Sequence, residues 1–185
     1  MIEYIRKYPQ FSLCGLNCGL CSWYYIDGPS RCPGCGGPNF HHHHTSCPVI
    51  TCNRKHDTVE YCFQCPEYPC ERFKESGKED SFISYRNVLT DFQLAKEDLA
   101  LYQDNLNRKI EILKLLLDRY NDGRRKNFYC MAVNLLPLDD LIRITEIINT
   151  DIDAQDPDPK TKAARVVALI NEYAQERGLE LKLRK

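Results

Sequence analysis

The sequence predicts a mainly α-helical protein with two parts, an irregular N-terminal lobe stapled by metal ions and an α-helical C-terminal lobe. Ten of the eleven cysteines fall between Cys14 and Cys70. Most glycines and prolines lie in residues 11–70, which show no sustained helical or strand periodicity. Apolar residues recur at helical spacing only farther along the chain. We therefore expect a metal-binding lobe over residues 1–80 and a helical lobe over 81–185, packed together.

The helical part is centred on one long amphipathic segment over residues 98–120. Its apolar side chains recur every three or four residues, which is the pattern of a single buried helical face: Leu99, Tyr102, Leu106, Ile110, Leu113, Leu117 and Tyr120. Pro137 and the pair Asp158 and Pro159 mark the limits of other helices. Further helices are predicted over 71–74, 126–136, 139–149 and 159–178, and alternating leucines favour a short strand over 179–183.

The spacing of the cysteines predicts metal sites. They follow one another as C-x3-C-x2-C, C-x2-C, C-x4-C and C-x2-C-x4-C, at Cys14, Cys18, Cys21, Cys32, Cys35, Cys47, Cys52, Cys62, Cys65 and Cys70. Thiolates this close along a chain converge readily on one ion. With so few aliphatic residues, apolar burial cannot offset a chain entropy of roughly 1–2 kcal/mol per residue, whereas structural zinc supplies on the order of 10 kcal/mol per site. Two or three zinc ions are expected.

The spacing leaves the assignment of ligands to sites open. The simplest sequential arrangement gives one ion Cys18, Cys21, Cys32 and Cys35, and another Cys47, Cys52, Cys62 and Cys65, but interleaved pairs fit equally well. A third site would need two ligands besides Cys14 and Cys70. His44, in the run 41–44, and His56 are candidates, although exposed loops explain these histidines at least as well. In CPGCGG, the glycines are expected to free backbone N–H groups for the thiolates.

Iron is the alternative to zinc. The run Cys14, Cys18 and Cys21 also has the spacing with which radical enzymes using S-adenosylmethionine hold an iron–sulfur cluster. Those enzymes need alternating strands and helices behind the motif, whereas here more cysteines and then helices follow. An iron–sulfur cluster without catalysis, or one iron held by four thiolates, remains as a redox alternative.

Composition and charge argue against several classes of protein. The chain has 25 Lys and Arg against 26 Asp and Glu, a net charge of −1, and no basic recognition helix, so nucleic-acid binding is not expected. No apolar run approaches the roughly 20 residues of a membrane span. The first residues lack the apolar core of a signal peptide. We expect a cytoplasmic protein, where a reducing environment favours metal ligation over disulfides.

No catalytic constellation stands out. Glu60 and Glu67 have no partner nucleophile in the pattern, and Cys130, between aromatic and aliphatic neighbours, is expected to be a buried core thiol. Whether the protein is an enzyme stays open, with structural sites favoured over catalytic ones. The expected role is a protein-interaction module that binds an unidentified protein partner.

Three cysteine blocks in one order give a resemblance to a known family. They are CGLNCGLC at residues 14–21, CPGCGG at 32–37 and CFQCPEYPCERF at 62–73. Together they resemble a family of small cysteine-rich bacterial and archaeal proteins of unknown function for which zinc binding has been suggested. The resemblance covers about residues 10–75 and extends more loosely to NDGRRKNFYCMAVNLLP. It implies a metal site and no established activity.

Overall fold

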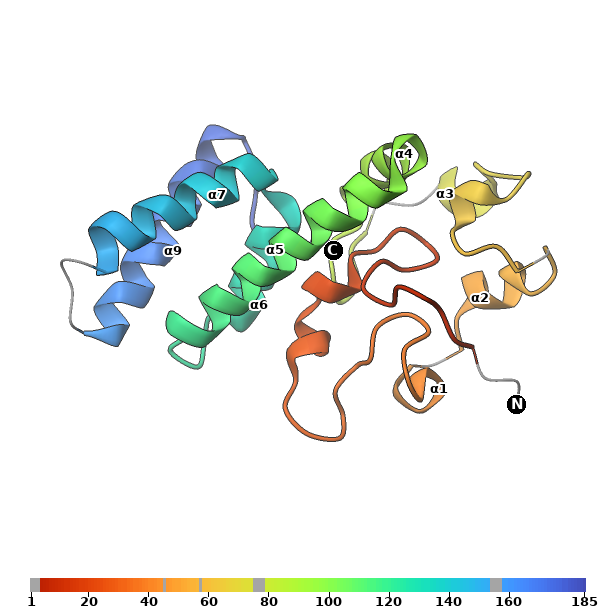
Figure 1. Cartoon of the computed structure of the whole chain (residues 1–185), viewed down its shortest axis with the longest axis horizontal. Coiled ribbons are helices and arrows are strands. Elements are labelled where there is room, and N and C mark those ends of the chain that lie inside the picture. The colour runs from red at the N-terminus through yellow and green to blue at the C-terminus, as the bar shows by residue number, and fades with distance from the viewer. Residues whose placement is uncertain (1–3, 45, 57, 75–78, 154–157) are drawn as a thin grey trace. The chain divides into compact units, whose positions relative to one another are not determined.

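The computed structural model describes residues 4–44, 46–56, 58–74, 79–153 and 158–185 (Figure 1). Within these ranges the chain is mainly α-helical and contains no strand, which confirms the predicted fold class. The chain divides into two compact units. Unit 1 comprises the residues up to Gln103 together with Leu183–Lys185, and unit 2 comprises Asp104–Lys182. The expected lobe boundary near residue 80 stays a prediction.

Unit 1 is built mostly from turns and short helices. Gly and Pro interrupt residues 11–70 so often that no segment there sustains more than a turn or two of helix. The elements are η1 (Cys18–Leu20), η2 (Ser22–Tyr25), α1 (Phe40–His43), α2 (Pro48–Asn53), η3 (Cys62–Gln64), α3 (Glu71–Lys74) and α4 (Val88–Glu97), followed by the start of α5 (Leu99–Arg119). The irregular character of this part and the helix over 71–74 are confirmed.

Helix α4 is absent from the sequence prediction. Its buried side chains Val88, Phe92 and Ala95 are spaced by four and three residues, as a helix requires. Two leucines on its other side, Leu89 and Leu94, are about half exposed (51% and 50%). Because these exposed leucines widen the apolar distribution around the helix, the buried stripe is hard to recognise in the sequence.

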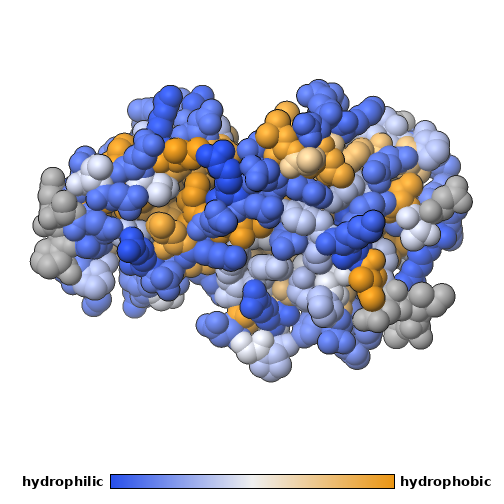
Figure 2. All heavy atoms as spheres, viewed as in Figure 1, coloured by the Kyte–Doolittle hydropathy of each residue, from blue (hydrophilic) through white to orange (hydrophobic). Residues whose placement is uncertain are grey.

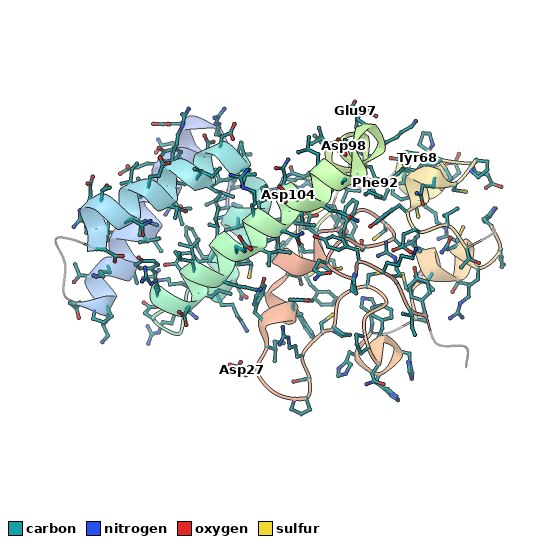
Figure 3. All side chains as sticks on the ribbon, viewed as in Figure 1. Asp27, Tyr68, Phe92, Glu97, Asp98 and Asp104 are labelled. Atoms are coloured by element: carbon teal, nitrogen blue, oxygen red, sulfur yellow. The ribbon has the colours of Figure 1, made fainter. Side chains whose placement is uncertain are left out.

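Aromatic side chains make up much of the apolar core of unit 1. Phe11 is fully buried, and its ring centroid lies 4.7 Å from that of Tyr102, 5.1 Å from Tyr61 and 5.8 Å from Phe92. Phe92 also meets Tyr68 edge to face at 5.6 Å (both labelled in Figure 3). Such pairs contribute about 0.5–1.5 kcal/mol beyond the area they bury. The cluster ties the cysteine-rich turns to α4 and the start of α5.

A buried polar contact reinforces this attachment. Asn17, within CGLNC, donates from Nδ2 to Asp91 Oδ2 of α4 (2.9 Å) and accepts at Oδ1 from the hydroxyl of Tyr102 in α5 (2.8 Å). The side chain is buried, so these hydrogen bonds replace those it would make with water. Burial raises the pKa of Tyr102 well above its ordinary value, which keeps the hydroxyl a donor. The cysteine motif is thereby fixed against both helices.

The last residues of the chain join unit 1 without forming the expected strand. The strand prediction over 179–183 is wrong, since these residues have no regular structure. Alternating leucines need a neighbouring strand to pair with, and none is present in the described ranges. Instead, the backbone N–H of Arg184 donates to Asp80 Oδ2 (2.9 Å) and its guanidinium to Asp80 Oδ1 (3.1 Å). The Asp80 side chain is fully buried.

Unit 2 packs helices around the remainder of α5. The elements are α6 (Lys126–Leu135), α7 (Leu138–Ile147), the π-helical turn η4 (Ile148–Ile152) and α9 (Pro159–Glu176), in agreement with the predicted helices to within a few residues. Asp158 caps α9 by accepting from Thr161 N–H (2.9 Å), as predicted. Cys130 is a buried thiol of α6. None of the described helices has the length and apolarity needed to cross a bilayer.

The buried face of α5 differs from the prediction at two positions, because Leu99 and Leu117 are only partly buried. Leu116 is 1% exposed, whereas Leu117 is only partly buried. Leu113, Leu116 and Tyr120 follow one another by three and four residues, which keeps the stripe on one face of a helix with 3.6 residues per turn. The expected helix over 98–120 is otherwise confirmed by α5.

The core role of α5 predicts a contrast between two leucines. Leu113 is fully buried, and Leu101 in the same helix is 57% exposed. Leu113→Ala should lower the free energy of unfolding by about 2–5 kcal/mol because it leaves a cavity. Leu101→Ala, the matched control, should change it by less than about 0.5 kcal/mol. Chemical denaturation measures both, and equal effects would show that the helix is not buried as described.

Asp80 predicts a defined dependence of stability on pH. Burial alone would raise the pKa of this carboxyl, but hydrogen bonds from Arg184 and from the N–H of Tyr85 lower it below the ordinary 3.8. The ionised Asp80 carboxylate therefore stabilises the folded state fully above pH 3.8, and this contribution is lost as the pH falls through the lowered pKa. The difference in unfolding free energy between wild type and Asp80→Asn should shrink below that pH. A difference that grows in acid would contradict this account.

Candidate metal centre

The CPGCGG turn takes its position from contacts with the N-terminal segment. Gly34 has a φ of +81°, and a Cβ on it would lie 2.5 Å from the carbonyl oxygen of Pro9, so a side chain is excluded there. The next N–H, that of Cys35, donates to the same carbonyl (3.0 Å), and Gly36 O accepts from Arg6 N–H (3.0 Å). These contacts hold the sulfur of Cys35 in the interior of unit 1.

Three thiols gather beside Cys35. Cys35 belongs to a buried cluster with Leu13, Phe40 and Ile50, and Cys18 and Cys47 pack against that cluster. Cys14 completes the set, because it and Cys47 are both electrostatic neighbours of Cys35. We call these four the interior group: Cys14, Cys18, Cys35 and Cys47.

The electrostatics of the interior group follow from this crowding. Burial raises the pKa of Cys18 well above its usual range, and the charges of Cys35 and Cys14 raise it further. Burial raises the pKa of Cys35 to about 11, with Cys14 and Cys47 contributing in the same direction. Nearby like charges disfavour one another in a partly desolvated setting. A cation among the sulfurs would therefore favour deprotonation of Cys14, Cys18 and Cys35.

Hydrogen bonding partly offsets the effect of burial on these sulfurs. Ser12, whose Oγ lies 3.2 Å from Cys14 Sγ, lowers the pKa of Cys14, and the backbone of Leu13 lowers the pKa of Cys35, in each case against the larger effect of burial. The expected donors were the glycines of CPGCGG, but Gly37 N–H instead donates to the carbonyl of Gly34 (3.2 Å). The donors come from residues around the cysteines, since the glycine backbone closes its own turn.

A second set of thiols lines a pocket beside α2, η3 and α3. We call Cys52, Cys62, Cys65 and Cys70 the pocket group, and the lining also includes His56 and Glu67. Burial raises the pKa of Cys62 to about 12, and the charges of Cys14, Cys70, Cys52 and Cys65 add to the effect. Cys62 also packs against the buried cluster of the interior group. It is therefore the contact between the two groups.

The neighbours in space agree in part with the sequential assignment of ligands, which stays a prediction. That assignment placed Cys18 and Cys35 with Cys21 and Cys32, and Cys47 with the later cysteines. In the structure, Cys18 has Cys35, Cys14 and Cys21 as electrostatic neighbours, Cys21 has Cys32, and Cys35 has Cys14 and Cys47. All eleven cysteines are free thiols. The ten candidate ligands thus comprise the interior group, the pocket group, and the pair Cys21 and Cys32, which is linked to the interior group through Cys18.

The donor set suits a thiophilic ion, but the side chains do not yet converge on one. Among the described residues, no three Cys, His, Asp or Glu side chains are placed to hold a metal ion together. Eight thiols in two neighbouring groups without disulfides have the chemistry of tetrahedral thiolate sites. Coordination requires movements that draw the sulfurs of each group together.

The histidines lie in two different settings. His41 and His42 are exposed, and His44 stacks on Phe40 with ring centroids 4.9 Å apart. The run therefore forms the surface turn α1 and the residue after it. His56, by contrast, lines the pocket beside the pocket group, and its Nδ1 lies 3.5 Å from Glu67 Oε1.

Arg6 is the central polar residue of this part of unit 1. It is 5% exposed, donates to the carbonyl oxygens of Phe11 (2.6 Å) and Glu60 (2.7 Å), and forms an ion pair with the Glu60 carboxylate (3.3 Å). Its guanidinium carbon lies 4.8 Å from the centre of the Tyr61 ring. Its positive charge lowers the pKa of Cys35 against the larger effect of burial. One cation thus joins the N-terminal segment to residues 60 and 61.

The comparisons with known proteins concern this segment. Residues 10–75 match the family model described as "Protein of unknown function (DUF3795)". The match confirms the resemblance drawn from the three cysteine blocks. Neither a curated protein nor a solved structure matches the chain. The DUF3795 segment contains all ten cysteines of the two groups and the pair, whereas Arg6 and helices α4 and α5 lie outside it.

Sequence reasoning missed the residues that position the DUF3795 segment. Arg6, Asn17 and Asn53 are buried polar side chains whose partners are backbone carbonyls or distant side chains. No local pattern marks an arginine that bonds to a carbonyl 54 residues away. For Asn17, its place between Cys14 and Cys18 was the only local signal.

The contribution of the Arg6 contacts to stability can be tested with a matched control. Arg31 makes the same kinds of contact, to the carbonyl of Tyr24 (2.9 Å) and over the Tyr24 ring (5.3 Å), but it is exposed. Arg6→Met should lower the unfolding free energy by about 2–4 kcal/mol, because buried carbonyls and Glu60 lose their partner. Arg31→Met should cost under about 1 kcal/mol. Denaturation curves that shift equally would contradict a special role for Arg6.

Proposed function

We propose that this protein binds zinc through its cysteine-rich segment and that the bound ions stabilise the fold of unit 1. The observation that carries the proposal is the interior group, four free thiols that neighbour one another around buried Cys35. Core cysteines have no reason to gather in fours from stretches as separate as residues 14–18 and 47. Zinc is typically held by four thiolates in structural sites.

The energetics of unit 1 support a structural role. Up to residue 74, the described residues of unit 1 form only turns and helices of six residues or fewer. Hydrogen-bonded secondary structure therefore contributes little to the stability of this part. A zinc ion would neutralise the thiolates of a group and cross-link the chain stretches that supply them. Because four protein ligands fill a tetrahedral ion, the interior site would leave no position for a substrate. We propose two such sites, and Cys21 and Cys32 would supply two ligands of a third.

A structural zinc protein without a catalytic site acts through its surface. We propose that unit 1 binds a protein partner. Exposed apolar side chains support this role: Leu89 and Leu94 on α4, where Figure 2 shows hydrophobic side chains at the surface, and Phe82, 58% exposed, against Trp23 (4.9 Å). The eleven free thiols favour the reducing cytoplasm as the compartment.

The iron alternative makes the same use of the sulfurs. Four thiolates of the interior group would also hold one iron or an iron–sulfur cluster. The triplet Cys14, Cys18 and Cys21 also has neighbours from other stretches, since Cys18 neighbours Cys35 and Cys21 neighbours Cys32. These additional thiols favour a site of paired stretches over the three-cysteine motif of radical enzymes.

Elemental analysis of protein purified without oxygen tests the proposal. Wild type should carry at least two zinc ions per chain and be colourless. Cys35→Ser should lose about one ion, because it removes a ligand of the interior group. Cys130→Ala is the matched control, a buried thiol outside both groups, and should retain the wild-type metal content. Fewer than one zinc per chain would refute the proposal, and brown protein containing iron and sulfide would establish the alternative.

A further inference from the structure

The pocket group is not built like the interior group. Its pocket is lined by Cys52, Cys62, Cys65 and Cys70 together with other side chains, among them exposed Glu67 and Arg72. Solvent therefore reaches its rim, whereas Cys35 of the interior group lies in a hydrophobic cluster. The lining also includes an imidazole, that of His56, and so offers five soft or borderline donors where a tetrahedral ion needs four.

The backbone after α2 brings Cys52 and His56 onto one turn. Lys55 N–H donates to Cys52 O (2.8 Å), and His56 N–H donates to Asn53 O (3.0 Å), so the chain continues to coil beyond Asn53. Cys52 and His56 both line the pocket, together with Cys62 and Cys65 at η3.

Glu67 lies beside the imidazole of His56. Its Oε1 lies 3.5 Å from His56 Nδ1. A carboxylate at one ring nitrogen fixes the tautomer in which that nitrogen carries the proton and the other, Nε2, keeps its lone pair. Metal-binding histidines in proteins are held in this way. The His56 side chain is 31% exposed, which leaves its ring partly enclosed by the pocket.

A buried acceptor in the pocket lacks a partner. Asn53 is 5% exposed and lines the pocket, and its Nδ2 donates to Val59 O (3.0 Å). Because a carbonyl only accepts, this bond fixes which end of the amide is nitrogen. The other end, Oδ1, is buried without a hydrogen-bond partner among the described residues. An unsatisfied buried acceptor is destabilising, and a cation or a donor bound in the pocket would satisfy it.

We infer that the pocket binds a divalent, thiophilic metal ion through a mixed set of thiolates and one imidazole, in which His56 Nε2 is a ligand and Glu67 is its positioning residue. This inference rests on the proposed function and specifies one of its sites. Three of the four pocket thiols complete the tetrahedron, and the fourth stays a free thiol next to the ion. Replacing one thiolate by neutral imidazole makes this site less negative than the four-thiolate interior site, and its solvent-accessible rim makes its ion the easier of the two to exchange.

Cadmium-113 NMR of the full-length protein distinguishes the two kinds of site. Zinc is exchanged for cadmium-113, and the histidines are labelled with nitrogen-15. Two resonances are expected, one at the higher chemical shift typical of four thiolates and one at the lower shift of three thiolates and a nitrogen. Only the second should show coupling to a histidine nitrogen. His56→Ala should abolish that coupling and move or remove the second resonance alone.

Two further variants complete the experiment. His42→Ala, an exposed histidine of α1, is the control and should leave both resonances in place. Glu67→Gln should weaken cadmium binding at the pocket site by about 10-fold or more, as loss of a ligand's orienting partner does, with the interior site unchanged. The interior resonance in each sample reports that unit 1 is still folded.

The outcomes separate this inference from the proposed function. Two four-thiolate resonances without histidine coupling would overturn the mixed site and leave zinc binding intact. A single four-thiolate resonance that is insensitive to His56→Ala would also overturn it. The absence of any bound cadmium or zinc would refute the proposed function itself.

Discussion

The burial of the Arg6 guanidinium is the interaction on which the cysteine-rich part of unit 1 depends. A charged group this deep needs partners. The two terminal nitrogens of Arg6 donate to the carbonyls of Phe11 and Glu60, and one of them also pairs with the Glu60 carboxylate, while Nε has no hydrogen-bond partner among the described residues. Those partners belong to stretches about 50 residues apart. Through its N–H bond to Gly36 it also fixes the turn that carries Cys35. The N-terminal segment thus joins residues 11, 36 and 60 of the DUF3795 segment.

The two thiol groups follow from that arrangement. With residues 6, 11 and 60 joined, the stretch from Cys14 to Cys18 faces Cys35, and Cys62 N–H donates to Leu13 O (2.9 Å). Cys62 therefore sits between the interior group and the pocket group. Because the groups share this contact, an ion bound at one biases the position of the other. In our proposal the two sites are consequently part of one cooperative structure.

Much of the fold could be predicted because local patterns determine it. The apolar stripe of α5, Pro159 with its cap at Asp158, and the dense Gly and Pro of residues 11–70 act through neighbouring residues, and each has its predicted consequence. Errors arose where a segment depends on a distant partner. Between Leu179 and Leu183, leucines alternate with polar residues as in a strand, yet the described residues contain no strand with which this segment could pair. Asp80 instead accepts a hydrogen bond from the N–H of Arg184.

The sequence by itself determined that ten cysteines in short spacings occupy an irregular segment followed by helices, because spacing and periodicity are local properties of a chain. Only the tertiary structure decided which cysteines are neighbours. Cys14 and Cys47 are 33 positions apart and meet through the fold, not through any motif. The same holds for His56, which a polar stretch of sequence left as one candidate among several and which the turn after α2 places in the thiol-lined pocket. Long-range contacts such as those of Arg6 decide these neighbourhoods, and no local pattern encodes them.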